Sequence, residues 1–279
     1  MLREWVLYLT TPAPLAFRRL GYVRESVSLY SRSRRCHTAW RPHLEATRAA
    51  IREAMAGLSR RQTVVVLGSG LLDDIPLATL AESFAQVRLV DAVHLWPARR
   101  AAGRYRNAER VTRDLGGSAA LLLRGETDLH DAVTPLCSAP DVDLVISANL
   151  LSQVPILPLD WYDERGWPEP PDLGRRLVSA HLDALGRTKA RVCLVTDTVE
   201  IELDREDRET DRLDLVHGVA LPPPDRCWDW DLAPFGESSA DRRLIHRVQA
   251  YTDWHRALRR QASQGPGKEK AVSRDGDGF

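Results

Sequence analysis

The segment Thr63–Leu67 constrains the fold of this chain more than any other. It is a continuous run of β-branched and aliphatic residues without polar alternation, and such runs are typical of strands buried on both faces of a parallel sheet. Gly68-Ser69-Gly70 follows directly, and residues 76–84 have helical composition. Neighbouring parallel strands need long crossover connections, so this strand predicts further strands that alternate with helices.

Similar apolar runs recur at the spacing that such crossovers require. They lie at residues 87–90, 143–147 and 191–195, with a weaker one at 110–112, and a helix-like stretch at 175–185 precedes the run at 191–195. Strands that alternate with helices predict an open, doubly wound α/β fold with a mostly parallel sheet and helices on both faces.

Composition divides the chain into an N-terminal helical extension or lid (1–60), a main domain (61–262) and a disordered tail (263–279). The extension should hold a helix over 25–58 that breaks at Pro42, and its apolar residues 5–9 should dock on the protein. The tail holds almost nothing to bury. In the main domain, the charged residues 202–212 predict a solvated loop or short helix. Strands are expected at 213–221, 228–232 and 244–251, with helix as an alternative for the last.

Charge and cysteine content exclude several function classes. Thirty-nine basic residues balance 39 acidic ones, and the sequence pI is about 7.1, which excludes a globally basic nucleic-acid-binding protein. Four scattered cysteines form no metal-ligand motif, so we expect no metal, reduced thiols and a cytoplasmic location. No apolar run approaches the ~20 residues that span a bilayer.

The turn after the first strand has the general plan of a nucleotide-binding site. Glycines let the backbone approach a ligand, and Asp91, at the end of the next strand, is placed to accept the hydroxyls of a ribose. Asp73 and Asp74 follow the turn, where they would cap the next helix and repel a pyrophosphate by ~1 kcal/mol or more for each close pair of charges. A cationic ligand with adenosine and no phosphate fits better, and S-adenosylmethionine is such a ligand.

The ordered motifs resemble those of the class I (Rossmann-like) S-adenosylmethionine-dependent methyltransferases over residues 62–197, and the bacterial small-molecule members most closely. Residues 64–70 look like the motif that holds the methionine half of the cofactor, and residues 87–91 like the one that grips the ribose. Thr112-Arg113-Asp114-Leu115 lies where the family reads adenine, and residues 143–151 look like the fourth-strand motif beside the reactive methyl. The resemblance implies a seven-stranded sheet. The first motif lacks its usual last glycine.

The resemblance implies three groups of candidate site residues. His43, Gln153 and His246 are candidates for catalysis, each with packing or capping as the alternative role. Arg35, Trp40, Ser152 and Trp161 are candidates for contact with the substrate. The cofactor candidates are Gly68, Ser69, Gly70, Asp74, Asp91, Asp114, Leu115 and Asn149.

These residues together predict S-adenosylmethionine-dependent methyl transfer to a small-molecule acceptor, without a nucleic-acid partner or a membrane span. Two alternatives stay open from the sequence. One is a degenerate cofactor-binding module that regulates or scaffolds a partner, which the missing glycine and the lack of an evident base would allow. The other is a nicotinamide-dependent oxidoreductase, which Asp73 and Asp74 oppose. The oligomeric state, the acceptor and the methylated atom are not predicted.

Overall fold

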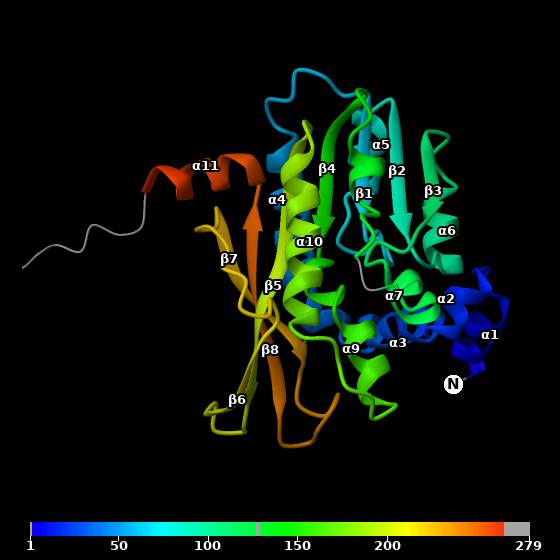
Figure 1. Cartoon of the computed structure of the whole chain (residues 1–279), viewed down its shortest axis with the longest axis vertical. Helices are drawn as coiled ribbons and strands as arrows, with labels where there is room; N and C mark the ends of the chain where they lie inside the picture. Colours follow the sequence, from blue (N-terminus) through cyan, green and yellow to red (C-terminus); the bar gives the residue numbers. More distant parts are fainter. Residues whose placement is uncertain (1, 127–128, 265–279) are drawn as a thin grey trace, which may run out of the picture.

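The computed structural model describes residues 2–126 and 129–264, which form one mixed sheet with helices on both faces (Figure 1). The strands are β1 (Thr63–Leu67), β2 (Gln86–Asp91), β3 (Ala108–Thr112), β4 (Val142–Ala148), β5 (Arg191–Leu203), β6 (Glu209–Asp214), β7 (Arg226–Ala233) and β8 (Arg243–Tyr251). The helices are α1 (Leu2–Thr10), α2 (Leu15–Arg19), α3 (Tyr22–Arg35), α4 (His37–Met55), α5 (Leu77–Ser83), α6 (Trp96–Ala102), α7 (Ser118–Arg124), α8 (Thr134–Cys137), the 3-10 turn η1 (Leu151–Gln153), α9 (Ile156–Asp163), α10 (Leu173–Arg187) and α11 (Trp254–Gln264).

The predicted fold class is confirmed. The strand order is β3-β2-β1-β4-β5-β8-β7, and strands β1 to β5 pair in parallel. β8 is antiparallel to both β5 and β7. Within the described residues this main path has the seven strands that were predicted, and an eighth strand, β6, pairs with the far part of β5, off the path.

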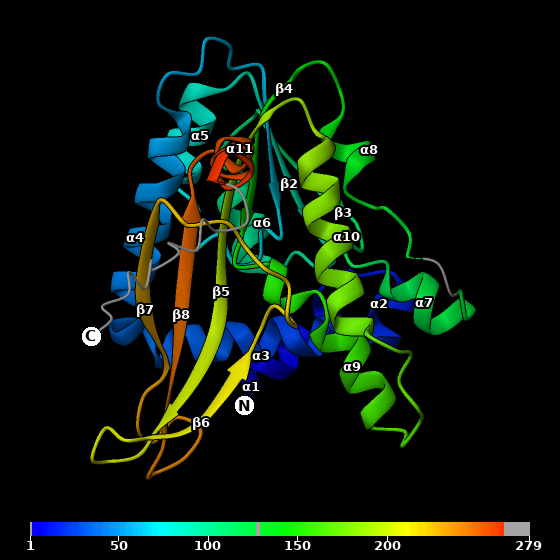
Figure 2. The ribbon, with the colours of Figure 1, turned by 60° about the vertical axis from the view of Figure 1, so that its left-hand side comes forward.

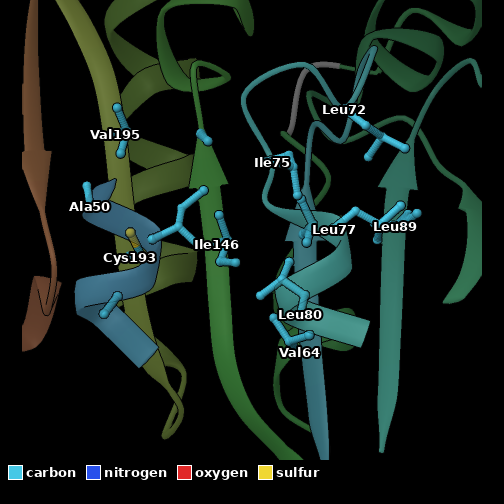
Figure 3. Close-up of a cluster of buried hydrophobic side chains, with 14 of the residues drawn as sticks. Ala50, Val64, Leu72, Ile75, Leu77, Leu80, Leu89, Ile146, Cys193 and Val195 are labelled. Atoms are coloured by element: carbon cyan, nitrogen blue, oxygen red, sulfur yellow. The ribbon is translucent and has the colours of Figure 1, made fainter. Parts of the chain in front are cut away.

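Alternate side chains of the central strand enter two different apolar clusters. Val64 and Val66 pack on the face that α4, α5 and α6 cover. Val65 and Leu67 pack on the opposite face, which α8, α10 and α11 cover. Figure 3 shows the first cluster, in which side chains of α4 and α5 meet those of β1, β2, β4 and β5. Burial on both faces explains why the strands read as continuous apolar runs.

The N-terminal residues form helices, but the break predicted at Pro42 is wrong. The chain bends at Cys36, between α3 and α4, and Pro42 lies inside α4. A proline removes one backbone hydrogen bond to the residue four positions earlier. That residue is Thr38, which is exposed, so water can satisfy its carbonyl group.

Two expectations in the second half of the domain are wrong in part. Residues 202–212 form a loop only at 204–208, because 202–203 end β5 and 209–212 begin β6 (Figure 2). Every residue of β6 is exposed, so no apolar alternation marks it. The strand expected at 213–221 ends at Asp214, whose carboxylate accepts the Val216 and Gly218 N–H groups in a turn. Strands at 228–232 and 244–251 are confirmed within β7 and β8.

The two ends of the chain differ from the sequence-based expectation. The tail predicted at 263–279 lies outside the described residues except for residues 263 and 264, which end α11. The apolar residues 5–9 are only partly docked: Leu7 is buried in α1, whereas Trp5, Val6 and Leu9 are exposed. No helix in the described part of the chain is long and apolar enough to cross a membrane.

The packing of α4 leads to the first testable prediction. Ile51 of α4 is fully buried in the cluster that covers the central strands, so Ile51→Ala should lower the free energy of unfolding by about 2–5 kcal/mol. Arg52→Ala on the exposed side of the same helix should change it by less than about 0.5 kcal/mol. Urea unfolding measures both. Equal, small effects would mean that residues 1–60 are a lid detachable from the core.

Candidate functional site

A cavity of about 420 Å³ lies at the carboxyl ends of the parallel strands. In Figure 1 these ends point downward, toward α3 and α9. The cavity is lined by residues at or just after the ends of β1, β2 and β4, by residues within β5, β7 and β8, and by residues of α3, α4 and α9. Ligands of open α/β sheets bind at this edge, just outside the carboxyl ends of the strands.

Most of the candidate residues from the sequence come together here. The lining includes Trp40, His43, Gly68, Gly70, Asp74, Asp91, Leu115, Asn149, Ser152, Gln153, Trp161 and His246. Ser69, Asp114 and Arg35 are not part of it. The cavity therefore joins residues that are more than 200 positions apart in the chain.

The glycine turn after β1 has a conformation that requires glycine. Gly68 has φ +68°, and a Cβ atom there would lie 3.0 Å from the Leu150 Cβ. Gly70 has φ +49°. Side chains are disfavoured in this left-handed region, so the turn keeps its backbone bare beside the cavity.

Asp91 connects the end of β2 to that turn. One carboxylate oxygen accepts the Gly70 N–H at 2.6 Å, and the other accepts the Val93 N–H at 3.2 Å. Burial raises the pKa of Asp91, and the hydrogen bond from Gly70 opposes that rise. Each oxygen has a second lone pair, so the carboxylate can hold the turn and still accept a hydrogen bond from a ligand.

Asp73 and Asp74 lie beside the turn. The sequence predicts that they cap the following helix, but neither of them does. α5 begins only at Leu77 and has no side-chain cap. The Asp74 carboxylate instead accepts a hydrogen bond from the Asn149 amide at 2.7 Å, and Asp73 accepts one from Ser33 at 2.6 Å. Burial raises the pKa of Asp74 to about 6, although the bond from Asn149 opposes this. Both carboxylates remain in the cavity wall.

His43 enters the cavity wall from α4 as a neutral ring. Its ring stacks on Trp230 at 4.0 Å between centroids, and its Nδ1 accepts the Trp228 indole N–H at 3.1 Å. Burial lowers the pKa of His43 to about 4. A neutral imidazole has one acceptor nitrogen, and a donor faces each ring nitrogen, because the Asn149 amide nitrogen lies 3.2 Å from Nε2. In either tautomer the single acceptor lone pair is engaged by a neighbouring donor. His43 therefore has no free lone pair with which to take a proton.

His246 is positively charged, whereas His43 is neutral. Its Nδ1 lies 2.6 Å from Asp197 and its Nε2 lies 2.8 Å from Glu200. Burial alone would lower the pKa of His246, but the hydrogen bonds to Asp197 and Glu200 outweigh it and raise the pKa to about 9. The ring is thus an imidazolium at neutral pH with both N–H groups donated, which is unsuited to a general base.

The other candidates are held by neighbours. Ser152 donates to Asp197, and the Gln153 amide donates to the Asn149 carbonyl oxygen at 2.6 Å. The Trp40 indole N–H donates to the Leu232 carbonyl oxygen at 2.9 Å. The Arg165 guanidinium lies 3.4 Å over the ring of Trp161. These contacts fix the walls of the cavity.

The three candidates outside the cavity have structural contacts. Ser69 is buried within the turn, and its N–H donates to the Val90 carbonyl oxygen at 3.0 Å. The buried Asp114 carboxylate accepts hydrogen bonds from Tyr22, at 2.8 Å, and from the N–H groups of Gly116 and Ala119. Arg35 forms a two-point ion pair with Glu237, with nitrogen–oxygen distances of 2.6 and 3.0 Å.

Sequence reasoning missed Asp197 and the cavity mouth. Asp197 follows a buried apolar run just as Asp91 does, so the same signal could have found it. Burial raises its pKa, but the hydrogen bond and charge of His246 outweigh this and hold the pKa below its usual range. At the mouth, Arg24 pairs with Glu25 at 3.0 Å and with Glu164 at 3.7 Å, a contact between α3 and the end of α9 that sequence spacing does not reveal.

Comparison with known proteins finds similarity to solved structures only. No protein-family model matches the chain, and no curated protein matches it. A 1,6-didemethyltoxoflavin-N1-methyltransferase from Burkholderia thailandensis is 16% identical, with 86% of this chain and 93% of that one covered and a TM-score of 0.40. The magnesium protoporphyrin IX methyltransferase of Synechocystis is 13% identical, with 89% and 90% covered and a TM-score of 0.36.

The N-methyltransferase NodS of Bradyrhizobium japonicum is 12% identical, with 74% of this chain and 85% of that chain covered and a TM-score of 0.35. At these scores the likeness carries no argument about cofactor or substrate. In the described residues, 2–126 and 129–264, no three His, Cys, Asp or Glu side chains are grouped to hold a metal ion.

The charge of His246 leads to a prediction of pH dependence. Its pKa is raised from 6.5 to about 9 in the folded protein, so its contribution to stability is complete below pH 6.5 and is lost as the pH rises toward 9. At 1.36 kcal/mol per pKa unit this amounts to about 3 kcal/mol. Wild type should lose most of its stability advantage over His246→Gln between pH 6.5 and 9 in urea unfolding. Parallel pH profiles for the two proteins would contradict a charged His246.

Proposed function

We propose that this protein transfers a methyl group from S-adenosylmethionine to a small-molecule acceptor. The proposal rests on one observation: Asp91, Asp73, Asp74 and the Gly68–Gly70 turn all border the same cavity. The turn suits a nucleoside ligand that approaches the backbone closely, and the two aspartates suit a ligand with positive charge. S-adenosylmethionine has both properties.

The cofactor would lie along the ends of β1 and β2. Gly68 and Gly70 would contact its methionine part, and Asp91 would accept the ribose hydroxyls through the lone pairs that Gly70 and Val93 leave free. Leu115 would pack on the adenine, since Leu115 and Gly116 line the cavity. We assign Asp114 the role of holding that loop, because Tyr22 and two backbone N–H groups already occupy its carboxylate.

Electrostatics favour this ligand over a dinucleotide. A pyrophosphate beside Asp73 and Asp74 would meet two carboxylates, each of which would repel it by ~1 kcal/mol at 4 Å even with water-like screening. The ammonium and sulfonium groups of S-adenosylmethionine would be attracted by the same charges. The raised pKa of Asp74, about 6, still leaves most of this carboxyl group ionised at pH 7.5.

The acceptor would bind at the other end of the cavity, near Asn149, Ser152 and Trp230. Methyl transfer forms a bond from the acceptor nucleophile to the methyl carbon while the carbon–sulfur bond breaks, and it needs mainly in-line alignment. His43 and His246 have no free lone pair for a proton. We therefore propose that the cavity walls align an acceptor that is already nucleophilic at neutral pH. The rate of methyl transfer would then depend on how well the acceptor is aligned with the methyl group.

Isothermal calorimetry with S-adenosylmethionine, S-adenosylhomocysteine and NAD tests the proposal directly. We expect the first two to bind and NAD to bind weakly or not at all. A clear preference for NAD would overturn the methyltransferase assignment. Binding of S-adenosylmethionine without methyl transfer to any member of a broad acceptor panel would favour the non-catalytic module.

Replacing the ribose acid gives a residue-level prediction. Asp91→Asn keeps an oxygen that can accept the Gly70 N–H but removes the charge, so S-adenosylhomocysteine should bind about 10- to 100-fold more weakly. Asp229→Asn is the matched control, because Asp229 is an exposed β7 residue in a surface ion pair with Arg247. Unchanged affinity in a folded Asp91→Asn variant would remove Asp91 from the cofactor site.

The two aspartates of the turn give a prediction about preference. Asp73→Asn with Asp74→Asn removes two negative charges, so S-adenosylmethionine should lose affinity relative to NAD. Salt screens such charges, so the change should be larger at low ionic strength. Paired titrations of wild type and the double variant measure the ratio at two salt concentrations. An unchanged ratio would show that these aspartates do not select the cofactor.

A further inference from the structure

One surface of the protein is unused by the proposed function. Leu2, Trp5, Val6 and Leu9 of α1 have 81%, 63%, 51% and 66% of their surface exposed. They stand at positions i, i+3, i+4 and i+7, so they share one face of the helix. We call these four residues the N-terminal stripe. Leu7 lies on the other side of α1, buried in the cluster that α3 helps to form.

One more apolar side chain extends this surface. Trp96 of α6 is 46% exposed. The Trp96 indole N–H lies 3.2 Å from the Thr10 carbonyl oxygen, so its ring sits at the carboxyl end of α1. Exposed apolar residues gathered in one place, unlike single scattered ones, mark an interaction site.

Arginines lie on and beside α1. The guanidinium groups of Arg3, on α1, and Arg34, on α3, lie 5.4 and 5.8 Å from the centre of the Tyr30 ring. Arg99 lies 5.2 Å from the centre of the Trp96 ring. Within residues 2–24 the only acid is Glu4, and its carboxylate accepts a hydrogen bond from Ser31 of α3 at 2.6 Å. The charge on and beside α1 is therefore mainly positive.

We propose that α1 binds the surface of an anionic lipid bilayer, with the N-terminal stripe inserted among the headgroups. Helices that lie in a membrane interface combine tryptophan and leucine on one face with basic residues around it. The negative potential of an anionic leaflet attracts such arginines. This surface is distinct from the cavity, and the inference does not depend on the proposed function.

A second copy of the chain is a less suitable occupant than a bilayer. α1 has nine residues, so it is roughly 14 Å long at 1.5 Å per residue. A stable dimer buries about 800 Å² on each partner, which is far more than one stripe of that length offers. A bilayer needs no complementary shape, and it accepts separate apolar side chains from one short helix.

Flotation of the full chain with vesicles tests the proposal. Wild type should float with vesicles of phosphatidylcholine mixed with phosphatidylglycerol, and less with phosphatidylcholine alone. Trp5→Ser with Leu9→Ser should weaken binding to the mixed vesicles about tenfold or more. The matched control is Trp167→Ser with Leu213→Ser, because these side chains are 57% and 54% exposed elsewhere on the protein. The control pair should bind as wild type does.

A second pair tests the charges without removing apolar surface. Arg3→Gln with Arg34→Gln should weaken binding to the mixed vesicles, whereas Arg52→Gln with Arg175→Gln, at exposed positions on α4 and α10, should not. High salt should weaken the binding of wild type.

Three results would overturn the proposal. The first is a wild-type chain that does not float with anionic vesicles. The second is equal binding by the stripe variant and its matched control. The third is a wild-type dimer, seen by light scattering, that Trp5→Ser with Leu9→Ser converts to a monomer, since this would assign the stripe to a second copy. Failure to bind S-adenosylmethionine would leave the proposal standing, because the two surfaces are separate.

Discussion

Burial of β1 on both faces is the constraint on which the rest of the structure depends. Val64 and Val66 must enter one apolar cluster and Val65 and Leu67 the other, and a shift by one residue would exchange the two sets. This register holds Gly68 at the edge of the sheet, where its bare backbone passes the Leu150 side chain. The same register places Asp91, at the end of the neighbouring strand β2, where it can accept the Gly70 N–H. The packing of the core thus determines the shape of the turn that begins the site.

The electrostatics of the site depend on residues from the antiparallel part of the sheet. His43 and His246 are both buried, yet their pKa values move in opposite directions, to about 4 and about 9. The difference lies in their partners: an indole N–H for His43, and the carboxylates of Asp197 and Glu200 for His246. Because β5 continues beyond β4, it presents Asp197 and Glu200 to β8. The long β5 strand therefore determines the charge state of His246 in the cavity wall.

The sequence predicted those parts that leave a local signal. Strands buried on both faces appear as apolar runs, so β1, β2 and β4 could be located. Asp91, the last residue of β2, follows such a run and could be located in the same way. β6 could not, because it is exposed along its whole length and its pairing with β5 depends on a turn built by Asp204 and Arg208. The ion pair of Arg35 with Glu237 leaves no local signal either, because the two residues lie 202 positions apart. Partners so distant are invisible to sequence spacing.

The N-terminal helices connect the N-terminal stripe to the cavity. α1 packs on α3 through the cluster that includes Leu7, Val23 and Val27, and α3 lines the cavity with residues such as Tyr22 and Leu29. Tyr22 also donates to Asp114, which holds the loop that carries Leu115. A displacement of α1 would thus reach the Leu115 side of the cavity through two contacts, one apolar and one polar. The polar contact is buried, with Asp114 only 8% exposed, and breaking it would leave a buried carboxylate without one of its donors. Moving α3 away from the sheet therefore has an energetic cost, and any shift of α1 is expected to move α3, Tyr22 and the loop that carries Leu115 together.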